Sequence, residues 1–249
     1  MKASTIELET GEPTADPVVN SSRRNFTKRS MQALLTISLL DHLYSANLLA
    51  AGAKMTAKKW LNEVNQIGLD VKGKKIKETE WQTQIEDLLQ NKIALPELLK
   101  LIDFDRVEKT VKFVDNGARS VRPEFPKIKG VTDKLVFGHQ VFALKKGRSV
   151  VPHGHNNMAT AFLMLQGDCH GRHYDRVEDG DGFIIIKPTI DEQFGVGKYS
   201  TVSDHKDNIH WFKAASDTAF IFNIHVLNVN ADISKGGRVY VDPFGEKLS

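Results

Sequence analysis

Residues 147–175, GRSVVPHGHNNMATAFLMLQGDCHGRHYD, are the stretch from which the fold is argued. At their centre, a single glycine separates His153 from His155. Because successive residues of a β-strand point to opposite faces, these two imidazoles lie on the same face of an extended segment. Apolar and β-branched residues flank the pair at 150–151 and 161–165, as is typical of packed strands. The pattern predicts a strand that offers two imidazoles to one metal ion.

Extended segments with short turn signals follow one another on both sides of this pair. Predicted strands cover residues 135–144, 149–153, 160–165, 170–176, 183–187, 210–213 and 218–226. Their close spacing, without helices between them, favours an antiparallel barrel. The acidic stretch EDGDG at residues 178–182 is expected to be a turn whose carboxylates face solvent. Residues 119–130, with Pro123, Pro126 and Gly130, are expected to form a loop before the first strand.

The spacing of these residues resembles the two sequence motifs of the cupin fold. Five residues separate Gly147 from His153, Gly167 follows an apolar strand, and His210 comes later. The resemblance implies a mainly β fold, a double-stranded β-helix or jelly-roll-like barrel, in which His153, His155 and His210 bind a metal. A metal cupin usually adds a glutamate shortly after the second histidine. Thr160 stands at that place, which favours the site of three histidines.

Further residues resemble one cupin subgroup, the cysteamine dioxygenase and plant cysteine oxidase family of thiol dioxygenases. The matching segments are His155-Asn-Asn-Met158, Leu165-Gln-Gly167, His170, Tyr174-Asp175, Asn208-Ile-His210-Trp-Phe212-Lys-Ala214 and Gly237-Arg238-Val-Tyr240. The resemblance spans residues 135–244 and implies Fe(II) held by the three histidines, with a thiol and dioxygen as substrates and a sulfinic acid as product. Zn, Mn, Ni and Cu stay open as alternatives to iron, since sites made only of imidazoles accept several ions. Catalytic residues other than the metal ligands are unassigned.

Departures from that subgroup bear on the site. Its members usually carry Pro-Gly before the methionine, where this chain has Asn156-Asn157, so the shape of that turn is open. An aspartate in the strand after the third histidine has no clear counterpart, since Phe222 or Asn223 falls there. The cysteine that some members crosslink to a tyrosine is missing near Tyr240, and no Cys–Tyr cofactor is therefore expected.

Other side chains are candidates for the surroundings of the metal or for the substrate pocket. They are His170, Tyr174, Asp175 and Tyr240. His170 and His173 are out of phase on one strand, so only one of them can face inward. The resemblance favours His170, and His173 is expected on the surface. Tyr174 and Asp175 are interpreted first as a hydrogen-bonding structural pair, while His225 on the last strand and His205 in a loop are weaker candidates.

Composition sets the broad class. The chain has 249 residues, of which 41% are hydrophobic and 26% charged, and its formal net charge is +3 at pH 7. These values fit one well-cored domain with an accessory segment. The lysines are spread over amphipathic stretches and not clustered with aromatics, so no nucleic-acid partner is expected. The single cysteine, Cys169, cannot form an intramolecular disulfide and is expected to be a buried strand residue.

The N-terminal region resembles an export signal. After the polar residues 1–21, which are expected to be disordered, Ser22-Arg23-Arg24-Asn25-Phe26-Thr27-Lys28 precedes a moderately apolar run and the small residues Ala51-Gly52-Ala53. The order resembles a twin-arginine signal, which implies passage of the folded chain through the twin-arginine machinery to the periplasm. The alternative is an amphipathic helix in a cytoplasmic protein, since Asp41 and His42 interrupt the apolar run.

A helical pattern follows over residues 55–113. Apolar residues recur three and four positions apart in groups around Trp60, Trp81 and Leu98, with a predicted break at residues 68–77. No His or Cys cluster lies on these helices, so we expect them to pack against the outside of the barrel and cover a sheet edge. The predicted organisation is a leader and signal at 1–53, an N-terminal α-helical segment at 54–118, and the metal-binding barrel at 119–249.

Two classes of function, one oxidative and one non-oxidative, fit this sequence. The first is an Fe(II)-dependent thiol dioxygenase that converts a small thiol or an N-terminal cysteine to a sulfinic acid. The alternative is a non-oxidative metal-binding cupin that binds a ligand without turnover, because one fold hosts many functions. A third reading, a Zn or Mn isomerase or hydrolase, is favoured if Glu192 or another carboxylate reaches the metal.

Overall fold

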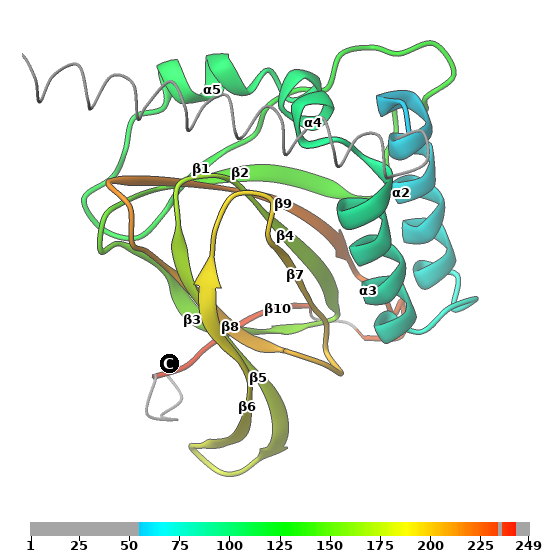
Figure 1. Ribbon diagram of the computed structural model, residues 1–249. Helices are drawn as coiled ribbons and strands as arrows, with labels where there is room; N and C mark the ends of the chain where they lie inside the picture. The colour runs from blue at the N-terminus through cyan, green and yellow to red at the C-terminus, as the bar shows by residue number, and fades with distance from the viewer. Residues whose placement is uncertain (1–54, 234–235, 243–249) are drawn as a thin grey trace, which may run out of the picture. The chain divides into compact units, whose positions relative to one another are not determined.

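The computed structural model describes residues 55–233 and 236–242 (Figure 1). The chain divides into two units, residues 1–52 and Ala53–Ser249, and all the described residues belong to the second. The first unit, with the predicted leader and twin-arginine signal, lies outside the described residues. Within the described part of the chain, no helix combines the length and apolar character needed to cross a membrane.

Helices occupy the N-terminal part of the second unit. They are α2 (Ala57–Lys72), α3 (Glu78–Asp87), a π-helical turn η1 (Leu88–Lys92), α4 (Leu95–Leu101) and α5 (Phe104–Thr110). The Thr56 side chain caps α2 by accepting from the Lys59 amide at 3.4 Å, and Pro96 lies in the first turn of α4. These helices lie within residues 54–118, whereas the division of the chain into three domains remains a prediction.

The predicted break between the first two helices begins too early. Gly68 is buried inside α2, and a Cβ atom there would lie 2.9 Å from Cγ1 of Val136. The glycine therefore permits close packing of the helix and does not end it. Helix α2 ends instead at Gly73, whose amide donates to the carbonyl oxygen of Leu69 at 2.8 Å.

Two five-stranded antiparallel sheets form the barrel. The first sheet has the order β1 (Arg119–Val121), β2 (Gly138–Lys145), β9 (Thr218–Leu227), β4 (Met158–Gln166) and β7 (Tyr199–Val202). The second has the order β10 (Gly237–Tyr240), β3 (Ser149–Asn156), β8 (Ile209–Ala214), β5 (Cys169–Asp179) and β6 (Ile184–Phe194). The chain changes sheet at almost every connection, which is the winding of a double-stranded β-helix. The predicted mainly β, cupin-type barrel is confirmed.

Three short strands, β1, β7 and β10, are absent from the sequence prediction. Residues 119–121 were assigned to a loop, and this is wrong, because Arg119 pairs with Ala143 and Val121 with Val141. Strands β1, β7 and β10 all lie at sheet edges and are only three or four residues long. Such segments are fixed by pairing with a long neighbour and not by their own alternation.

The first sheet is buried on both faces. Phe142, Phe162 and Ile221 point into the barrel, towards Phe212 of the second sheet. Neighbouring residues of the same strands pack on the opposite face against the helices, and Figure 1 shows α2 and α3 beside this sheet. Helix α3 also contacts the edge strand β7. Burial on both faces explains why β4 and β9 are almost continuous apolar runs.

Phe220 joins the helices to this sheet and provides a test of the packing. Its ring is 1% exposed and meets Phe104 of α5 edge to face at 5.2 Å between centroids. We expect Phe220→Ala to lower the free energy of unfolding by about 3–5 kcal/mol, since a large buried ring leaves a cavity. Phe183→Ala, at a ring that is 49% exposed, should change it by less than about 0.5 kcal/mol. Urea denaturation measures both, and equal effects would contradict the packing.

Candidate metal centre

Three histidines meet inside the barrel. His153 and His155 lie on β3, and His210 lies on β8 directly opposite His153. Cross-strand partners share a face of the sheet, and all three side chains point inward, where they are at most 2% exposed. One nitrogen from each ring lies within 4.8 Å of the others. The structure thus brings the predicted ligands together in a group that could hold a metal ion.

Backbone carbonyl groups orient two of these rings. His153 Nδ1 lies 2.7 Å from the carbonyl oxygen of Val151, and His210 Nδ1 lies 3.0 Å from that of Asn208. A carbonyl oxygen only accepts hydrogen bonds, so both Nδ1 atoms carry the proton and both Nε2 atoms present a lone pair. His155 Nδ1 lies 3.3 Å from the hydroxyl group of Thr160. Thr160, which stands where metal cupins usually have a glutamate, therefore helps to orient the ring of His155.

The Nε2 atoms of the triad fit a bound cation. His153 Nε2 and His155 Nε2 are 3.1 Å apart, and the buried His210 Nε2 has no hydrogen-bond partner among the described residues. An unpaired buried nitrogen costs about 1–3 kcal/mol. A metal ion accepts all three lone pairs at once, so the donor set suits imidazole-binding metals such as Fe, Zn, Ni or Cu.

Burial keeps the triad in its metal-binding form. Desolvation lowers the pKa of His153 to about 4. Desolvation, followed by the charge of neighbouring histidines, lowers the pKa of His155 and of His210 well below the ordinary value. The three imidazoles are therefore neutral at pH 7, and the neutral ring is the form that binds metals.

No carboxylate joins this group of ligands among the residues that the structure describes. Glu192 is exposed on β6 and pairs with Lys198 at 2.7 Å between Oε2 and Nζ. The isomerase or hydrolase hypothesis requires a carboxylate at the metal. No such carboxylate is found in the described part of the chain.

The expected roles of His170 and His173 are reversed. His173 is fully buried, pairs with His210 across β5 and β8, and lies 5.7 Å from its ring between centroids. His170 points outward and bonds to Asp191. The prediction was right that only one of the two faces inward and wrong about which. Gly171 packs against the ring of Phe194 on the inner face of β5. His173 lies two residues later on the same strand and therefore shares this face.

The other candidates lie at different distances from the triad. Tyr174 stacks on Trp211 at 5.2 Å on the outer face of the second sheet. Asp175 accepts a hydrogen bond from the Asp207 amide at 2.8 Å, which is a structural role. Only Tyr240 of this set approaches a predicted ligand, with its ring 6.1 Å from that of His153.

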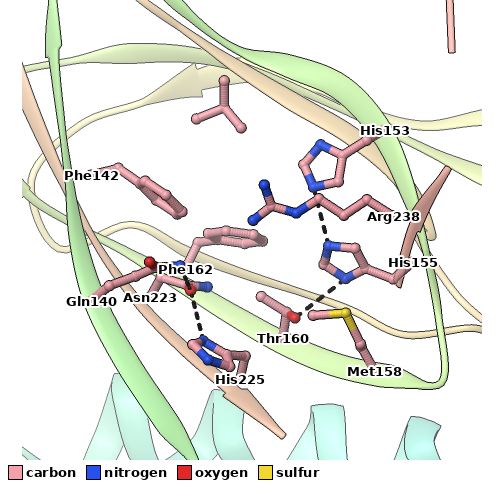
Figure 2. Close-up of a pocket in the computed structure, with 11 residues that line it drawn as sticks. Gln140, Phe142, His153, His155, Met158, Thr160, Phe162, Asn223, His225 and Arg238 are labelled. Atoms are coloured by element: carbon pink, nitrogen blue, oxygen red, sulfur yellow. Dashed lines mark hydrogen bonds between the residues drawn. The ribbon is translucent and has the colours of Figure 1, made fainter. Parts of the chain in front are cut away.

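A cavity of about 350 Å³, including its open mouth, adjoins His153 and His155 (Figure 2). Its apolar lining residues are Phe142, Val150, Met158 and Phe162. Its polar lining residues, besides the two histidines and Thr160, are Gln140, Asn223, His225 and Arg238. Gln140 donates to Asn223 at 2.9 Å, and His225 Nδ1 lies 3.2 Å from the same oxygen. The sequence prediction missed Gln140 and the roles of Asn223 and Arg238, and named His225 only weakly.

Asn157 adopts the backbone conformation that the turn after β3 requires. Its φ of 61° lies in the left-handed region, which glycine favours and asparagine tolerates. Its side chain donates to the Asn230 carbonyl at 2.9 Å and accepts from the Asn230 amide at 2.7 Å. Asparagine at the place of the subgroup's glycine is thus compatible with the turn and also ties it to the segment after β9.

Comparisons with known proteins find only low similarity. No family model matches the sequence, and no curated protein matches it significantly. Solved structures similar to this chain include a double-stranded β-helix protein from Klebsiella pneumoniae, with 10% identity, TM-score 0.34, and coverage of 54% of this chain and 87% of the other. A cupin sugar phosphate isomerase from Silicibacter pomeroyi has 15% identity, TM-score 0.36, and coverages of 51% and 66%.

Procruciferin from Brassica napus has 11% identity, TM-score 0.33, and coverage of 43% of this chain but only 23% of its own. These similarities are too low to indicate a function. The fold assignment therefore rests on the strand order and on the placement of the triad.

Substitution of the triad tests metal binding. We expect His153→Ala, His155→Ala and His210→Ala each to abolish stoichiometric binding of Fe(II) or Zn(II), because each removes one of three nitrogen donors. His170→Ala, at the outward-facing histidine of β5, is the matched control and should keep the metal. Elemental analysis after dialysis measures the content. Full metal content in His210→Ala would contradict the assignment.

Protonation of His225 should be visible in the stability of the metal-free protein. Burial, and then the charge of Arg122, lower the pKa of His225 to about 4. Because the unfolded chain binds this proton near pH 6.5, the free energy of unfolding falls as the pH drops from about 6.5 to 4. The slope is up to about 1.4 kcal/mol per pH unit from this residue. Urea denaturation of His225→Gln should show a shallower slope than the parent, and identical slopes would contradict it.

Proposed function

We propose that this protein is an Fe(II)-dependent thiol dioxygenase that converts a small thiol to a sulfinic acid. The observation that supports it most is the buried set of three neutral imidazoles, with no carboxylate in the group among the described residues. The resemblance of residues 135–244 to thiol dioxygenases points in the same direction. The proposed substrates are a thiol, including an N-terminal cysteine, and dioxygen.

Charge favours a thiolate at such a site. Three neutral ligands leave the charge of a divalent ion uncompensated, whereas a carboxylate ligand would cancel part of it. A cation lowers the pKa of a thiol that binds to it, so the substrate binds as thiolate. Three protein donors also leave positions open for small molecules. Bound iron would supply the binding position for sulfur and the activation of dioxygen.

The protein's own residues hold the ligands and restrict water. The carbonyl groups of Val151 and Asn208 fix the rings of His153 and His210, and Phe142 and Phe162 line the pocket with apolar surface. The overall reaction is RSH + O₂ → RSO₂H, in which both oxygen atoms become bonded to sulfur. Sulfur loses four electrons and dioxygen gains four, so no further reductant is needed.

The alternative is a metal-binding cupin that binds a ligand without turnover, and the same triad supports it. The two differ in whether oxygen is consumed. Export of the folded chain to the periplasm by the twin-arginine machinery is a separate prediction, with a cytoplasmic location as its alternative. The predicted signal lies outside the described residues.

Oxygen consumption tests the proposal. Protein loaded with Fe(II) under argon should consume oxygen when mixed with a panel of thiols: 3-mercaptopropionate, cysteine, cysteamine and a peptide with N-terminal cysteine. One thiol should disappear per O₂ consumed, with the sulfinic acid identified by mass spectrometry. His210→Ala should lose the activity at least about a hundredfold, while His170→Ala should keep it. Absence of uptake with every thiol, with iron bound and the fold intact, would refute the dioxygenase and leave the ligand-binding alternative.

A further inference from the structure

Met158 presents a thioether to the pocket beside the triad. It is the first residue of β4, three residues after His155, and it lines the same cavity as His153 and His155 (Figure 2). Its side chain keeps some contact with solvent. Its backbone amide donates to the Asp204 carboxylate at 3.4 Å, which holds this residue in place. A small molecule that enters the pocket therefore meets the sulfur atom of Met158.

A second methionine on the same strand is shielded. Met158 and Met164 are six residues apart on β4, so their side chains point to the same side of the sheet. Met164 is only 1% exposed and packs inside the barrel with Phe212 and Ile221. Of these two thioethers, only that of Met158 can be reached from the pocket without opening of the barrel.

The single cysteine of the chain is also protected. Cys169 is fully buried, and burial raises its pKa to about 12. The thiolate is the form of cysteine that oxidants attack, so this thiol is inert at pH 7. It does not compete with Met158 for an oxidant.

Thr160 offers a partner for an oxygen atom on the Met158 sulfur. The two residues are two positions apart on β4, so they share a face, and both line the pocket. When His155 binds a metal through Nε2, its Nδ1 carries the proton and donates to the Thr160 hydroxyl oxygen at 3.3 Å. The hydroxyl hydrogen of Thr160 can then be donated to an acceptor in the pocket, and a sulfoxide oxygen is such an acceptor.

We propose that Met158 is a reversible oxidation site, at which hydrogen peroxide converts the thioether to a sulfoxide that closes the pocket to small ligands. This inference goes beyond the proposed function and does not depend on it. One oxygen atom of the peroxide bonds to sulfur while the O–O bond breaks. The hydrogen on that oxygen passes to the departing oxygen atom, which leaves as water. Sulfur loses two electrons, and the peroxide gains two.

The size of the pocket explains why one oxygen atom would close it. The enclosed part of the pocket is about 50 Å³, and a water-sized group occupies about 10–15 Å³ of such space. The sulfoxide also replaces an apolar surface by a polar and chiral one. Oxidation therefore changes both the free space and the polarity beside His155.

Peptide mass spectrometry tests the order of oxidation. Full-length protein is loaded with Zn(II), which has no redox chemistry, treated with hydrogen peroxide, and digested at intervals. Met158 should be oxidised at least about tenfold faster than Met164, because the buried thioether reacts only after local opening. In urea the two rates should become equal. Equal rates in the folded protein, or faster oxidation of Met164, would overturn the inference.

Ligand binding after oxidation tests the closure of the pocket. Once the peroxide is removed, calorimetric titration of the zinc-loaded protein with 2-mercaptoethanol should give an affinity at least about tenfold lower than before treatment. Met158→Leu, which conserves volume, should keep its affinity through the same treatment. Met164→Leu is the matched control on the same strand and should lose affinity as the parent does. Methionine sulfoxide reductases, with dithiothreitol removed before titration, should restore it.

These measurements are separate from the test of the dioxygenase. They use zinc and follow sulfur oxidation and binding, so absence of oxygen uptake with every thiol leaves their outcome unaffected. The Met158→Leu variant also distinguishes Met158 from the other methionines of the chain. An affinity that peroxide does not change, or that falls equally in Met158→Leu, would overturn the closure. Circular dichroism and metal content confirm that each variant is folded and loaded.

Discussion

Three buried imidazoles that bring one nitrogen each within 4.8 Å of the others are the constraint on which the rest of the site depends. Asn208 contacts two of the three histidines. Its backbone carbonyl orients the ring of His210, and its side-chain amide donates to the carbonyl of His155 at 2.8 Å. Gly154 makes this possible, because a Cβ atom there would lie 2.5 Å from Oδ1 of Asn208. The glycine between the two histidines is therefore required by packing, in addition to the spacing that brings the rings together.

The two sheets contribute differently to holding this arrangement. The first sheet is buried between the helices and the barrel interior, so its strands cannot shift without opening two apolar layers. The second sheet carries the triad and extends into the β5–β6 hairpin, where Val177 and Phe183 are exposed. The rigid wall thus faces the ligands, and Thr160 on its strand β4 reaches across to His155. Ligand geometry is best kept when the supporting residues lie on such packed elements.

Features that show a residue pattern over a whole strand could be predicted from the sequence. Features that depend on a single contact with another strand could not. The histidine pair and the apolar runs of β4 and β9 carry their own period, and the barrel and the meeting of the three histidines could be predicted from them. Strand β5 has polar residues on both faces, so its alternation does not indicate which face is inside, and the resemblance selected His170 where packing selects His173. Arg238 has no pattern of its own in the sequence that places it in the pocket, because its position depends on pairing with His155.

Arg238 lies on a different strand from the predicted metal ligands. The ligands lie on β3 and β8, whereas Arg238 lies on the edge strand β10, reached through a connection that Asn157 holds by hydrogen bonds to Asn230. Replacing a side chain on an edge strand disturbs few other contacts, because one of its sides has no neighbouring strand. Asn157 stands directly after β3, so the residue that shapes the turn after His155 also bonds to Asn230 and Ile233, which follow β9. A change of charge at Arg238 therefore leaves the strands that carry the three histidines unaltered.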